Sequence, residues 1–179
     1  MDIEQESIVF EIVSDMQKDN RKYDIRNKEI TPDRLAHKAL DFAHGFHKVI
    51  DLITDSKNLD QILYCEQIAT VLALESEILL KSLLYRSTSE NNFKWIVEHD
   101  LIKLFVALPE EDRTSIHITF NADEQKHMSY KDFIASIEEI KDTFTQFRYC
   151  FELNGFTLKY HFLKTFTQAV YHYSSKIDS

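Results

Sequence analysis

Arg148 is the residue best suited to bind a phosphate, and it lies in the segment FRYCFE at residues 147–152. Phe147 and Phe151 border it on one apolar helix face, along which the aliphatic stem of the arginine can lie while its guanidinium reaches a polar group. Glu152 follows one helical turn later and is a candidate partner. The segment therefore predicts either a phosphate-binding arginine or an ordinary ion pair between Arg148 and Glu152.

Two further carboxylates stand inside the apolar segment ALESEILLKSLLY, residues 73–85. Glu75 and Glu77 interrupt a run that is hydrophobic around most of a helix. If they are buried they need partners, because an unpaired charge in the protein interior is costly. The alternative is that both face solvent at a gap in the apolar stripe, and the sequence leaves the two interpretations open.

A third group of polar side chains is a stripe of Asp33, His37, Asp41 and His44, which recur about one turn apart on one side of a helix. Metal sites in helical bundles usually draw ligands from several facing helices, and no HExxH motif appears elsewhere to complete this one. We therefore predict no metal and expect the stripe to be solvated or to meet another subunit. A metal site on these four side chains is the alternative. With 2 glycines the chain has no glycine-rich phosphate loop, so no cofactor is predicted either.

Long helices must position these side chains, because the 179 residues include only 2 Gly and 2 Pro, which turns recruit. Thr31 suits an N-cap and Pro32 the first position of a helix. Gly45 interrupts that helix at a cost of about 1 kcal/mol, which a close helix crossing would offset. The apolar stripe expected to be buried there comprises Leu35, Ala39, Phe42, Phe46, Val49, Ile50 and Ile53.

Hydrophobic periodicity predicts the remaining helices and the fold class. The fold class is all-α, an antiparallel bundle of about five to seven helices, in a single domain over residues 1–179. The predicted helices cover 3–19, the stretch from 32 to a polar connection at 56–60, 61–86, 101–108, a short helix within 109–120, 129–153 and 156–173.

The short segment HDLIKLFVAL, residues 99–108, has the residues of a helix start. Asp100 can accept from the free N–H groups of the first turn, and Pro109 ends the helix. Leu101 and Leu104 are expected to pack inward. His99 is expected to bond nearby backbone, so its predicted role is structural.

The formal net charge is -9 and the pI is near 5.3. A chain this acidic is a poor non-specific binder of polyanions, although a local basic site would still permit RNA binding. The N-terminus lacks a basic region, and no apolar run reaches transmembrane length. These features predict a cytoplasmic protein.

Three of these segments occur in an order that resembles the HEPN domain family: ALESEILLKSLLY, then HDLIKLFVALPEE, then a helix that ends in FRYCFE. The resemblance covers residues 62–165, with 1–57 as an added N-terminal helical region. HEPN domains are all-helical and usually dimeric. Many are ribonucleases of toxin–antitoxin, defence or RNA-processing systems, and others are inactive modules that accompany nucleotidyltransferases.

Active HEPN domains carry an arginine followed, after four to six residues, by a histidine, and two such motifs meet across the dimer. Arg148 matches the arginine, but Asn154 stands where the histidine is wanted. Asparagine does not titrate and cannot transfer a proton as histidine does. The resemblance therefore implies a catalytically degenerate module that dimerises and binds a protein, nucleotide or RNA. The alternative is a metal-independent ribonuclease with an atypical site at Arg148, Glu152 and Asn154.

Overall fold

The structure is a computed structural model that describes residues 31–54, 65–88, 96–124, 127–144 and 159–177. The described residues form helices and no strand, which confirms the all-α prediction. The helices are α2 (Pro32–Thr54), α3 (Cys65–Ser87), α4 (Leu101–Ala107), α5 (Glu110–Glu124), α6 (Tyr130–Ile140) and α8 (Tyr160–Ile177). The predicted helix over 3–19 lies outside the described residues.

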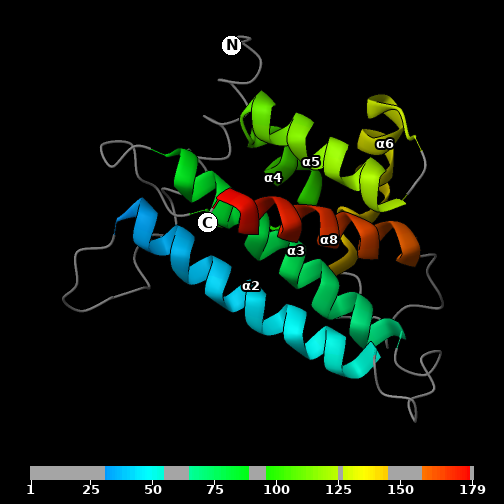
Figure 1. The fold of residues 1–179 in the computed structure, drawn as a ribbon, viewed down its shortest axis with the longest axis horizontal. Coiled ribbons are helices and arrows are strands. Elements are labelled where there is room, and N and C mark those ends of the chain that lie inside the picture. The colour runs from blue at the N-terminus through cyan, green and yellow to red at the C-terminus, as the bar shows by residue number, and fades with distance from the viewer. Residues whose placement is uncertain (1–30, 55–64, 89–95, 125–126, 145–158, 178–179) are drawn as a thin grey trace.

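Helix α3 is the centre of the fold (Figure 1). Helices α2, α8 and α4 all pack against it. Helices α2 and α3 run antiparallel. The Ser82 hydroxyl donates to the Ala36 carbonyl near the start of α2, and Glu75 meets His47 nearer its end. Helix α8 packs on both α3 and α5, so it connects the pair of α2 and α3 with α5.

Phenylalanine rings from four helices pack together in the core between α4, α5, α6 and α8. They are Phe105, Phe120, Phe133, Phe162 and Phe166, with ring centroids between 5.0 and 6.1 Å apart in the contacting pairs. Edge-to-face and tilted contacts of this kind add to the stabilisation that comes from burying the rings. The aromatic residues of the last helix include two of these rings, so those two pack inward.

The helix starts read from the sequence are confirmed at two places. Thr31 Oγ1 accepts from the Arg34 N–H at the start of α2. Asp100 accepts from the N–H groups of Ile102 and Lys103 at 3.0 and 3.2 Å, which makes it the N-cap of α4.

Three helices end elsewhere than predicted. Helix α8 continues to Ile177, beyond the predicted end at residue 173. Helix α5 continues to Glu124, although residues 121–129 read as a loop, and three acidic side chains in its first turn favour the helix start. Helix α6 ends at Ile140, so the predicted helix over 129–153 is interrupted there, and its part from 145 to 153 lies outside the described residues. In the turn at residues 141–142 the Lys141 carbonyl accepts from the Leu101 N–H at the start of α4, and residues 143–144 are helical again.

The buried face of α2 overlaps the predicted stripe only in part, since Ile50 is buried but Leu35, Ala39 and Phe46 are half-buried. The side chains turned toward α3 are Ala36, Leu40, Ala43 and Ile50, whereas Phe42 and Val49 are exposed. Helix α2 carries apolar residues on two faces, and the smaller ones face α3 because alanines allow the two helices to approach closely. A methyl group added at Gly45 would meet no described atom within 4 Å, so no described part of the chain crosses there.

Replacing Asp100 with Ala is expected to lower the free energy of unfolding by about 1 kcal/mol, because two N–H groups of α4 lose their acceptor. Urea denaturation followed by circular dichroism measures the change. Asp100→Asn is the matched control, since its amide oxygen can still cap the helix, and it should change stability by only a few tenths of a kcal/mol. Equal losses in both variants would contradict the capping role.

Replacing Gly45 with Ala is expected to stabilise the isolated chain by roughly 0.5–1 kcal/mol, because alanine loses less conformational freedom in a helix and the added methyl group finds open space. Thermal unfolding at low protein concentration tests this. A lower melting temperature in Gly45→Ala would show that the methyl group meets an atom of the same chain.

Candidate functional site

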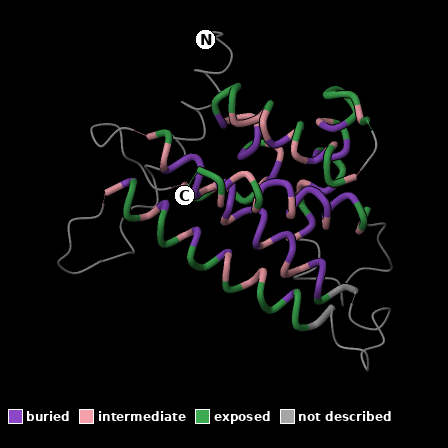
Figure 2. Tube along the Cα trace, viewed as in Figure 1, coloured by how far each residue is buried: buried purple, intermediate pink, exposed green. Residues whose placement is uncertain are grey.

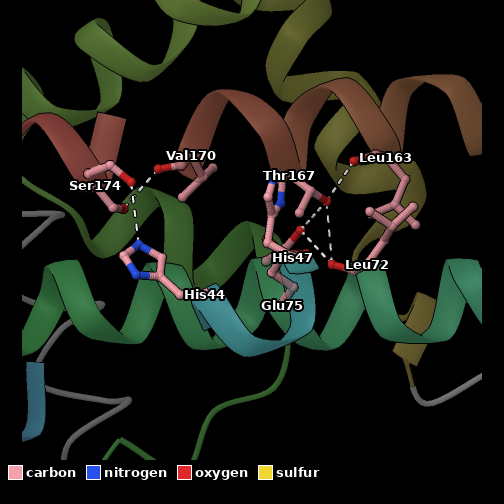
Figure 3. Close-up of polar contacts among 10 residues, drawn as sticks. His44, His47, Leu72, Glu75, Leu163, Thr167, Val170 and Ser174 are labelled. Atoms are coloured by element: carbon pink, nitrogen blue, oxygen red, sulfur yellow. Dashed lines mark hydrogen bonds and ion pairs between the residues drawn. The ribbon is translucent and has the colours of Figure 1, made fainter. Parts of the chain in front are cut away.

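The first buried carboxylate belongs to Glu75, whose side chain is 0 % exposed in the middle of α3. His47 reaches it from α2, and the imidazole Nδ1–H donates to Glu75 Oε1 at 2.9 Å. The ring of Tyr171, on α8, stacks on the imidazole with centroids 3.9 Å apart and planes 9° apart. Figure 3 shows His44 and His47 between α3 and α8. The pair therefore lies where three helices meet.

Burial and hydrogen bonding change the proton affinity of both members of this pair. Removal from water raises the pKa of the Glu75 carboxyl, and this effect outweighs the opposing effect of His47. The hydrogen bond to Glu75 raises the pKa of the His47 imidazole. Glu75 Oε2 has no hydrogen-bond partner. The pair therefore holds a shared proton more tightly than either group would in water.

The second buried carboxylate belongs to Glu77, which is 4 % exposed and lies on a different side of α3. Lys81 Nζ donates to Glu77 Oε1 at 2.8 Å, and His99 Nδ1–H donates to the same oxygen at 2.8 Å. The His99 side chain is 61 % exposed, so most of its ring faces solvent. His99 was expected to bond nearby backbone; instead its side chain, which precedes α4, pairs with a carboxylate of α3.

An imidazole oriented by a carboxylate through Nδ1 is the arrangement that general acid–base catalysis uses. Of the two pairs described here, only that of His99 and Glu77 has the exposure for such chemistry. The imidazole of His47 is covered by Tyr171 and its side chain is 17 % exposed, so this pair has a structural role.

The sequence left open whether Glu75 and Glu77 are buried with partners or exposed, and the structure shows them buried and paired. The other predicted site residues, Arg148, Glu152 and Asn154, lie outside the described residues.

The side chains of the stripe on α2 do not converge. His37 Nε2 lies 3.6 Å from Asp33 Oδ1, whereas Asp41 is exposed and His44 turns toward α8, where its ring meets Tyr171 edge-on at 5.2 Å. Within the described ranges no group of three or more His, Cys, Asp or Glu side chains is placed to hold a metal ion.

His47 was missed at the sequence level, although a signal for it exists. It falls at the helical spacing of the residues that face α3, between Ala43 and Ile50. A histidine at such a position on one helix and a glutamate inside an apolar stretch of the next are typical of a buried pair. Two other histidines have partners of a different kind. His117 lies 2.9 Å from the Met128 carbonyl oxygen, and His161 contacts Glu124 at the surface.

Comparison of the chain with protein-family models, with curated proteins and with solved structures gives no match. Among the described helices, none combines the length and the apolar character that crossing a membrane requires.

The pair of His47 and Glu75 is expected to stabilise the fold more at low pH than at high pH. Both pKa values are raised on folding, so the folded chain binds more protons than the unfolded chain once the pH exceeds the unfolded values of 4.5 for the carboxyl and 6.5 for the imidazole. The stability that the pair contributes is therefore lost as the pH rises through the two folded-state pKa values. The measurement is the difference in unfolding free energy between wild type and the double variant His47→Gln/Glu75→Gln from pH 5 to pH 8, which should shrink with rising pH.

The matched control is His172→Gln/Asp123→Asn, which alters a more exposed pair whose atoms lie 3.2 Å apart between α8 and α5. Exposed pairs contribute little, so its difference from wild type should stay nearly constant. A difference that grows with pH in the first variant would contradict the shared buried proton.

Proposed function

We propose that this chain is a HEPN-like helical module that acts by dimerising and by binding a protein, nucleotide or RNA partner, without catalysis of its own. The setting that the resemblance implies is a toxin–antitoxin or defence system, with a nucleotidyltransferase as one candidate protein partner. The observation that carries the proposal is the contact between His99 and Glu77 at 2.8 Å. This contact joins a side chain of ALESEILLKSLLY to a side chain of HDLIKLFVALPEE, which are two of the three segments that resemble the family.

The absence of catalysis follows from the residue at the expected proton-transfer position. Asn154 stands where the family pattern has a histidine, and an amide does not titrate near neutral pH, so it cannot act as a general acid or base. Arg148 would retain the capacity to bind a phosphate through its guanidinium. A net charge of -9 further favours recognition of a specific partner over general binding to nucleic acid.

A second candidate function is a metal-independent ribonuclease, and one observation favours it. His99 is exposed and is oriented by Glu77, so it has the geometry of a general base even though it lies outside the family motif. In this alternative His99 would supply the proton transfer that Asn154 lacks, and Arg148, with Glu152 nearby in sequence, would bind the phosphate.

RNA cleavage without added metal distinguishes the two functions. We expect purified wild type, Arg148→Ala and His99→Ala to leave a panel of structured and unstructured RNAs equally intact. If the alternative holds, wild type cleaves and His99→Ala loses about 10²–10⁴-fold of the rate, which is the range for a removed general acid or base.

His127→Ala is the matched control, because His127 is an exposed histidine that precedes α6. Cleavage that is equal in Arg148→Ala, His99→Ala and His127→Ala would indicate a contaminating nuclease. Cleavage lost in Arg148→Ala or His99→Ala and retained in His127→Ala would overturn the non-catalytic proposal.

A further inference from the structure

The face of α2 that points away from α3 carries three exposed apolar side chains, together with charged ones, and the described helices do not cover it. Phe42 is 69 % exposed, Val49 45 % and Leu52 74 %, and Gly45 lies between them on the same side of the helix. Figure 2 shows exposed residues recurring along α2, in alternation with the buried residues that face α3. Large apolar side chains clustered on one outward face mark an interaction site rather than the scattered exposure that is normal for a surface.

The residues of this outer face are arranged almost symmetrically about Gly45. Phe42 precedes it by three positions and Val49 follows it by four, whereas Asp41 precedes it by four and Lys48 follows it by three. At about 100° of rotation per residue, Phe42 and Val49 lie on one flank of the face, and Asp41 and Lys48 lie on the other flank. Asp41 and Lys48 are both exposed.

We propose that a second copy of this chain packs on the outer face of α2, with the two α2 helices antiparallel and the twofold axis passing beside Gly45. Such an axis places the same flank of each helix opposite the other, with the two chains running in opposite directions. Asp41 then faces the partner's Lys48, and Lys48 faces the partner's Asp41. On the other flank Phe42 packs against the partner's Val49, and the reciprocal contact forms by symmetry. This inference deepens the dimerisation in the proposed function and rests on that part of it.

Charge complementarity favours a second copy over a different protein. A face that carries one acid and one base at symmetric positions neutralises itself on a twofold axis, and an unrelated partner has no need of that symmetry. Gly45 fits the same arrangement, because the absence of a side chain at the crossing point lets two helices approach closely. No described atom of its own chain occupies that space, so the glycine has no packing role within the described fold.

Charge reversal tests the pairing of Asp41 with the partner's Lys48, because a mixture of two opposite variants should restore a dimer that each variant alone loses. In Asp41→Lys both positions are positive, and in Lys48→Asp both are negative, so each variant repels its own copy. We expect wild type to sediment as a dimer and each single variant to associate at least about tenfold more weakly. Mixing the two variants should restore a dimer that contains one chain of each, because all the facing charges are then opposite.

Three further variants complete the experiment. Lys131→Asp reverses an exposed charge on α6 and should leave the dimer unchanged. Phe42→Ser should weaken association without lowering the melting temperature of the dilute chain. Gly45→Ala should weaken association as well, because the added methyl groups would separate the helices at their crossing.

Several outcomes would overturn the inference. Wild type that dimerises equally well in both single variants would place the dimer interface elsewhere and leave the dimeric module of the proposed function standing. A wild-type monomer whose melting temperature falls in Phe42→Ser would assign the face to another segment of the same chain. A mixture of Asp41→Lys and Lys48→Asp that stays monomeric would exclude the antiparallel pairing. The proposed lack of catalysis is judged separately by RNA cleavage, so the two proposals can fail independently.

Discussion

Two carboxylates buried two residues apart in the central helix constrain much of this fold. A carboxylate removed from water is costly unless a partner accompanies it. Residues i and i+2 point about 200° apart around a helix, so Glu75 and Glu77 cannot share one partner. Their histidines come from α2 and from the segment before α4. The position of α2 and the course of the chain into α4 are therefore both coupled to α3.

Buried hydroxyl groups form further polar contacts between α3 and its neighbours α8 and α2. Ser76 and Thr167 lie 2.7 Å apart between α3 and α8, and Ser82 donates to α2. If α2 shifted by one turn, the buried Ser82 hydroxyl would lose its acceptor, which is destabilising. If α8 shifted, Ser76 and Thr167 would lose their contact with each other, although each hydroxyl also lies within hydrogen-bond distance of a carbonyl of its own helix. Apolar packing alone would tolerate such a shift more readily. The polar contacts consequently select one register among several that the hydrophobic residues would allow.

The sequence was sufficient where a single residue determines the local backbone. Asp100 before an apolar turn, and Thr31 before Pro32, define helix starts without help from the rest of the chain. It was insufficient for the orientation of α2, because Phe42 and Ala43 are both apolar and only the neighbouring helix decides which is buried. The partner of Glu75 lies 28 positions away, and local periodicity does not extend that far. The candidate site around Arg148 lies beyond the described residues, so it stays a prediction.

The contact between Ser76 and Thr167 has a consequence for how the protein is made. These residues are 91 positions apart, and Thr167 belongs to a helix that also supplies Phe162 and Phe166 to the core. During synthesis, α2 and α3 can pair early, but the α3 surface that α8 covers stays exposed until α8 has emerged from the ribosome. Exposed apolar surface of this kind is what chaperones bind and what causes aggregation. A nascent chain of this protein is therefore expected to depend on chaperones until α8 has been synthesised.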